Sequence, residues 1–111
     1  MELKKYILII REDIRTSRPD NELQKIIKLH IQWAKDLAAK EIFINGYGLN
    51  GQGCLLELVN GEIVTKDIPY PEIAFGGLYV IQAESIETAI EIGKQCPTFS
   101  IGDKNEVREL I

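Results

Sequence analysis

Apolar and polar positions form two kinds of pattern in the first half of the chain. A continuous apolar run over residues 4–11 predicts a strand that is covered on both faces or lies centrally in its sheet. From Leu23 onward, apolar residues recur at three- and four-residue spacing, which predicts a helix over about residues 20–40. On this helix His30 falls near the middle of the apolar face, and Trp33 lies on the edge of that face.

Turn residues divide the middle of the chain into short strands. Residues 41–46 predict a strand, and the glycine-rich residues 47–53 predict a loop. Asn60 and Gly61 lie between two apolar-rich stretches, which is the strongest short-range signal for a β-hairpin with a two-residue type I′ turn. Two prolines in residues 67–75 remove backbone donors, so this segment is predicted to cross the surface or to run along a sheet edge.

The last third of the chain predicts a strand, a helix and a final strand. The strand covers residues 76–84, Ser85 is the expected N-cap of the helix, Pro97 stops that helix, and residues 106–111 form the closing strand. The predicted inward face of this helix consists of Ile86, Ala89, Ile90 and Gly93.

The complete order is strand, helix, strand, hairpin, strand, helix, strand, without an internal linker or repeat. It predicts one α+β domain over residues 1–111, with a ferredoxin-like antiparallel sheet and two helices on one face. The other face of such a sheet would be uncovered in a domain of this size. We therefore expect a homodimer in which a second copy covers that face.

Composition and charge narrow the function classes. With 45% hydrophobic and 27% charged residues, the chain has the composition of an ordered globular domain. The net charge is −4 and the 13 Lys and Arg residues are scattered, so we expect no nucleic-acid partner. No apolar run approaches the roughly 20 residues of a membrane helix, and the N-terminal apolar stretch is too short for a signal peptide. These features predict a cytoplasmic protein without a membrane partner.

The two cysteines carry no ligand signature. Cys54 and Cys96 lie in a predicted strand and at a predicted helix end, without CxxC or Cys/His spacing, and both are predicted to be buried thiols. The glycines do not form a nucleotide-binding pattern, and no spacing of metal ligands occurs. We therefore expect neither a metal nor another cofactor.

Three blocks in the second half of the chain resemble the YCII-related (DGPF-motif) family. The sequence DIPYPE from Asp67 resembles the DGPF-A-E signature, GGLYVIQAESIETAIEIGKQCP resembles the strand and helix block, and the closing EVREL resembles the terminal EVRP of the family. Ile68 stands in place of Gly, Tyr70 stands in place of Phe, and the stretch after Pro69 is shorter and lacks the Thr-Lys pair of the family. The chain thus resembles a divergent member.

The resemblance implies a dimeric α+β barrel, in which the sheets of two copies face each other and a cleft forms between sheet, helix and signature loop. Members of the family have been viewed as enzymes on account of a His and Asp pair, and one relative is a dehydrochlorinase of aromatic diols. The position of His30 on its helix resembles that of the family histidine.

His30 and Asp67 are the candidate catalytic residues. His30 is the only histidine, and an imidazole is suited to proton transfer near neutral pH; the alternative is a core residue satisfied by one hydrogen bond. Asp67 precedes a proline-stiffened loop, where a carboxylate could orient the imidazole and stabilise its cation. The alternative for Asp67 is a hydrogen bond to backbone amides of its own turn.

Trp33, Tyr47, Tyr70 and Glu72 are the candidate ligand-binding residues. Their aromatic rings combine apolar area with a polar edge, which suits a planar ligand, although packing is the alternative use of Trp33. Glu72 would supply a second carboxylate or lie in solvent. Two functions remain open: a small-molecule enzyme that uses His and Asp acid-base chemistry for an elimination or isomerisation, and a non-catalytic dimeric module that binds a ligand or a regulatory partner.

Overall fold

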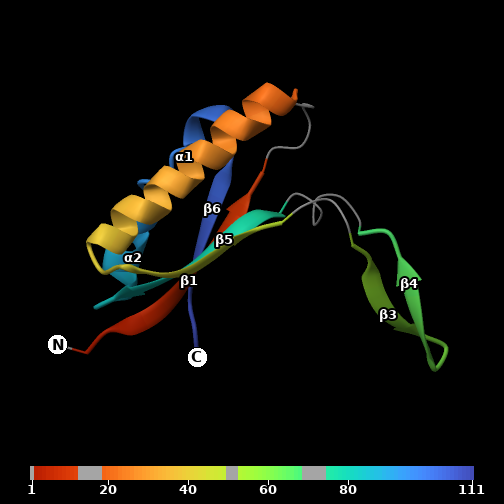
Figure 1. The fold of residues 1–111 in the computed structure, drawn as a ribbon. Coiled ribbons are helices and arrows are strands. Elements are labelled where there is room, and N and C mark those ends of the chain that lie inside the picture. Colours follow the sequence, from red (N-terminus) through yellow and green to blue (C-terminus); the bar gives the residue numbers. More distant parts are fainter. Residues whose placement is uncertain (1, 13–18, 50–52, 69–74) are drawn as a thin grey trace.

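The computed structural model describes residues 2–12, 19–49, 53–68 and 75–111. Figure 1 shows its elements in chain order, which are β1 (Lys4–Arg11), α1 (Asp20–Ala39), β2 (Phe43–Gly48), β3 (Leu55–Val59), β4 (Glu62–Lys66), β5 (Phe75–Ala83), α2 (Ile86–Gly93), the short 3₁₀ helix η2 (Phe99–Ile101) and β6 (Lys104–Glu109). None of the helices in these ranges is long and apolar enough to cross a membrane.

One antiparallel sheet with the order β2-β5-β1-β6 forms the body of the domain. Both helices lie on the same side of this sheet (Figure 1). The predicted α+β class, with an antiparallel sheet and two helices on one face, is confirmed, and the strand order is consistent with a ferredoxin-like fold. The local signals behind this prediction also hold, because the Ser85 hydroxyl accepts a hydrogen bond from the Thr88 backbone at 3.2 Å as an N-cap.

The core lies between the sheet and the two helices. Tyr6, Leu8 and Ile10 alternate along β1 with half-buried isoleucines, as expected when one sheet face is covered and the other is not. The remaining buried apolar positions come from β5, the helices and the segment that follows α2: Trp33, Leu37, Tyr79, Ile81, Ala83, Ala89, Ile92 and Cys96.

The hairpin of β3 and β4 stands apart from this body (Figure 1). Its turn residues Asn60 and Gly61 have φ angles of 50° and 82°, as a type I′ turn requires. All of β3 is exposed, and Leu56, Leu58 and Ile63 retain 63 to 67% of their accessible surface. For this reason the prediction that Cys54 is buried is wrong: it precedes β3 and is exposed, whereas Cys96 is buried as predicted.

Three further expectations are corrected by the packing. Trp33 was expected at the edge of the apolar face of α1, but it is buried at 6% exposure, whereas Leu23 is 40% exposed. In α2 the inward residue is Ile92 rather than Ile90. Strand β2 extends through Gly48, which was predicted to lie in a loop, because Tyr47 and Gly48 pair with β5.

Candidate functional site

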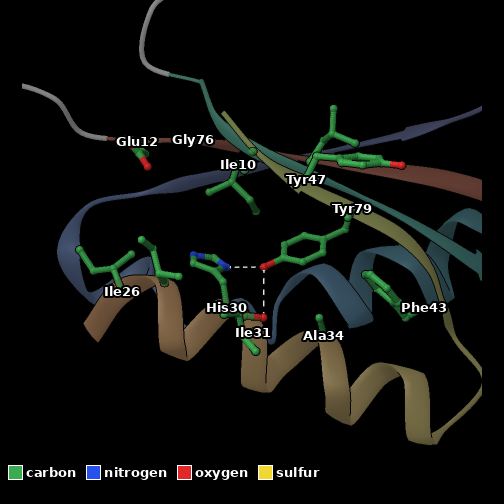
Figure 2. A pocket seen from close by; sticks show the side chains of 15 residues that line it. Ile10, Glu12, Ile26, His30, Ile31, Ala34, Phe43, Tyr47, Gly76 and Tyr79 are labelled. Atoms are coloured by element: carbon green, nitrogen blue, oxygen red, sulfur yellow. Dashed lines mark hydrogen bonds between the residues drawn. The ribbon is translucent and has the colours of Figure 1, made fainter. Parts of the chain in front are cut away.

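A cavity of about 240 Å³ lies between α1 and the helix-facing side of the sheet (Figure 2). Its walls are mainly apolar, and backbone segments of four glycines in β2 and β5 form part of one side. The polar side chains among the described lining residues are Glu12, His30, Tyr47 and Tyr79. The described apolar residues of α1, β1 and β2 that line the cavity are Ile10, Ile26, Ile27, Ile31, Ala34 and Phe43.

Helix α1 and strand β5 bring His30 and Tyr79 together in this cavity (Figure 2). His30 lies one turn before Trp33, so both residues face the sheet. The Trp33 ring packs edge-on against Tyr79 with ring centroids 4.9 Å apart, and Phe43 contacts Tyr79 from β2 at 6.3 Å. Tyr79 is therefore held between aromatic neighbours, which fixes where its hydroxyl lies.

Both nitrogens of His30 form hydrogen bonds. Nδ1 lies 2.5 Å from the Tyr79 hydroxyl, and Nε2 lies 3.1 Å from the hydroxyl of Thr98. Thr98 is 1% exposed, and its hydroxyl is also 3.4 Å from the Cys96 sulfur. A neutral imidazole donates from one nitrogen and accepts at the other, and either hydroxyl can take either role. The result is a continuous chain of hydrogen bonds from Cys96 through Thr98 and His30 to Tyr79.

Burial sets the charge state of this chain. The pKa of His30 is lowered by burial, and the negative charge of Asp103 opposes this shift without overcoming it. The imidazole is therefore mainly neutral at pH 7, which is the form that can take up a proton. Burial, with a smaller contribution from Cys96, raises the pKa of Tyr79 far above its ordinary value, so the phenol stays protonated.

The structure does not bring Asp67 to His30. Asp67 follows β4 and is exposed, it does not line the cavity, and the described partners of the imidazole are the two hydroxyls. The carboxylate whose charge reaches His30 is instead Asp103, which is 6% exposed and lies between η2 and β6. The backbone amide of Asp103 donates to the Thr98 carbonyl at 3.3 Å, which ties the acidic residue to the same turn as the hydroxyl.

The candidate ligand-binding residues lie in different places. Tyr47 contributes to the cavity wall, but the residue is 63% exposed and its ring points away from His30 in Figure 2. Trp33 lies behind Tyr79 and is absent from the described lining. Tyr70 and Glu72 lie outside the described residues.

Tyr79, Thr98 and Asp103 were not among the residues predicted for the site. The alternation along β5 carried a signal for Tyr79, because this residue has the same parity as the buried Ile81 and so faces the helices. Thr98 directly follows Pro97, after the end of α2 at Gly93, and nothing in its local pattern indicates that it meets a residue 68 positions earlier. Such a contact is a property of the tertiary fold.

Comparison with known proteins identifies the family. A family model described as the YCII-related domain matches residues 5–110, which is nearly the whole chain. The chain belongs to the YCII-related family. The resemblance drawn from DIPYPE, GGLYVIQA and EVREL is thereby confirmed, and residues 5–110 place His30, Tyr79, Thr98 and Asp103 all within the YCII-related domain. A search of curated proteins finds no match to this chain.

Proposed function

We propose that this YCII-related protein is a cytoplasmic small-molecule enzyme that works by general acid-base chemistry, in an elimination or an isomerisation. The observation that supports it is a neutral imidazole, hydrogen-bonded to Tyr79, in the wall of an apolar cavity large enough for a small molecule. A histidine whose charged form is disfavoured by burial is a base at neutral pH.

His30 and the two hydroxyls would share the proton transfer. The Tyr79 hydroxyl would pass its proton to Nδ1 as it takes one from the substrate, while Nε2 keeps its own proton and donates it in a hydrogen bond to the Thr98 hydroxyl. The nearby charge of Asp103 favours the imidazolium formed in this step. A separate orienting carboxylate is therefore not needed beside His30, and a role for Asp67 stays a prediction.

Replacement of His30 tests the proposal. Once a screen of metabolites for conversion has found a substrate, His30→Gln is expected to lower kcat by at least about a hundredfold, because a general base contributes 10²–10⁴ in rate. Lys28→Gln, on the exposed side of the same helix, serves as the control and should keep wild-type turnover. Full turnover by His30→Gln would show that the imidazole is not the base.

A non-catalytic, ligand-binding module is the second candidate. It is favoured by one observation: both imidazole nitrogens already have protein partners, so His30 serves structure as well as chemistry. The same screen separates the candidates, because a compound that binds in the cavity and is recovered unchanged supports the binding module.

We also propose that two copies associate through the sheet face opposite the helices. Ile7, Ile9, Leu78 and Val80 lie side by side on that face, in register between β1 and β5, and each is only half-buried.

Sedimentation equilibrium is expected to give twice the chain mass of 12.6 kDa, and Val80→Lys should give a folded monomer. Glu87→Lys on α2 should remain dimeric, and a wild-type monomer with an intact fold would contradict the proposal.

A further inference from the structure

We infer that the cavity takes an uncharged, largely apolar molecule of one or two rings with one hydroxyl or carbonyl oxygen, and that the Tyr79 hydroxyl contacts that oxygen. This substrate class rests on the proposed function, because it takes the cavity beside His30 as the place where the reaction occurs. Cavity size, charge and the use of hydrogen-bonding groups each support it separately.

The size of the cavity limits the ligand. An engineered cavity of about 150 Å³ in another protein binds benzene, and sites for drug-sized ligands start at about 300 Å³. The cavity described here has about 240 Å³, so it lies between these two cases. A compact molecule of one or two rings fits this volume.

The charge of the described cavity walls disfavours anions. No Lys or Arg is among the described residues that line the cavity, and the acidic residue among them is Glu12. The imidazole of His30 is mainly neutral at this pH. Removal of a carboxylate or phosphate from water without a cationic partner is costly, so an uncharged ligand is favoured.

Among the hydrogen-bonded groups around His30, the Tyr79 hydroxyl is the one that can also contact a ligand. Each nitrogen of His30 has a single site, and those sites are directed at Tyr79 and at the buried Thr98. The Tyr79 hydroxyl has one proton and two lone pairs, and it lies 2.5 Å from Nδ1 of His30 and 3.5 Å from the His30 backbone oxygen, to which it can donate. A ligand hydroxyl would donate to the remaining lone pair of Tyr79. A ligand carbonyl would accept the Tyr79 proton in place of the His30 backbone oxygen, with Nδ1 donating to Tyr79 and the Thr98 hydroxyl donating to Nε2.

Four compounds with a common carbon frame test this inference by equilibrium binding. Indanol, indanone, indane and indanecarboxylate are titrated into the protein and followed by the NMR signals of the single histidine. We expect indanol or indanone to bind several-fold tighter than indane and at least about tenfold tighter than indanecarboxylate. Tyr79→Phe should abolish the difference between the oxygenated compounds and indane. Tyr6→Phe is the matched control and should retain that difference, because Tyr6 belongs to the core and is not among the described residues that line the cavity.

Each other outcome overturns part or all of the inference. Carboxylate binding equal to that of indanol would contradict the uncharged class, and an undiminished preference in Tyr79→Phe would exclude Tyr79 as the contact. Failure of all four compounds to bind up to their solubility would contradict the class as a whole. None of these results depends on turnover, so they are distinct from a failure of His30→Gln to reduce catalysis, which would contradict the enzyme alone.

Discussion

Gly77→Ala is expected to lower the free energy of unfolding by about 2–3 kcal/mol, because an added methyl group has no space between β2 and β5. A Cβ atom at Gly77 would lie 2.6 Å from the backbone oxygen of Tyr47 and 3.2 Å from the Cα atom of Gly48. Backbone atoms of a paired strand cannot rotate away, so β2 must shift from its partner. Urea denaturation followed by circular dichroism would measure the loss.

The neighbouring residue provides the control. A Cβ atom at Gly76 would also be crowded, at 2.5 Å, but the atoms it meets belong to the exposed side chain of Glu12, which can adopt another rotamer. We therefore expect Gly76→Ala to cost less than about 1 kcal/mol. Equal losses in the two variants would show that strand separation is not what glycine at position 77 prevents.

Thr98→Val is expected to cost about 1–3 kcal/mol of unfolding free energy, because valine has nearly the shape of threonine but leaves Nε2 of His30 without a hydrogen-bond partner. The same substitution should lower the pKa of His30 further, since the imidazolium loses the acceptor for its Nε2 proton. The protein has one histidine, so an NMR titration reports this pKa without assignment by mutagenesis.

The pH dependence of stability follows from the direction of the His30 shift. The folded pKa is below the ordinary value of 6.5, so between the two values the unfolded chain binds more protons than the folded one. The contribution of His30 to the free energy of unfolding is therefore present above about pH 6.5 and is lost as the pH falls through the folded pKa. In Thr98→Val the pH range over which stability falls should extend to lower pH. The loss of unfolding free energy across that range should be larger than in wild type.

Thr98→Ser keeps the hydroxyl and is the matched control. We expect its His30 pKa to equal that of wild type, with a smaller stability loss from the missing methyl group. If the His30 pKa is the same in Thr98→Val, Thr98→Ser and wild type, the hydrogen bond from Nε2 does not set the charge state of the imidazole.

Elements with a local cause could be predicted from the sequence. The 3.6-residue period of α1, the Asn60-Gly61 turn and the Ser85 cap each depend on residues that are close in the chain, and the structure contains all three. The extension of β2 through Gly48 has no such cause. It forms because β5 offers a pairing edge, and this pairing overrides the loop preference of the glycines.

The candidate site was predictable only in part for the same reason. A single histidine on an apolar helix face indicated His30, and the structure places it in the cavity wall. Its partners come from β5 and from the turn after α2, and the sequence does not state which strand or turn faces the helix. Asp67 was chosen for its local context, a carboxylate before two prolines, whereas the charge that reaches His30 comes from the distant Asp103.

The hydrogen-bonded chain through His30 also constrains when the site can form during folding. It joins Tyr79 and Thr98, which are 49 and 68 positions from His30 in the sequence. Contacts of such long range form late, because the entropy of closing the intervening loops must first be overcome. A nascent chain released only as far as α2 would hold an imidazole with one partner at most. Acid-base competence is thus a property of the completed domain, and a partly synthesised chain would not have it.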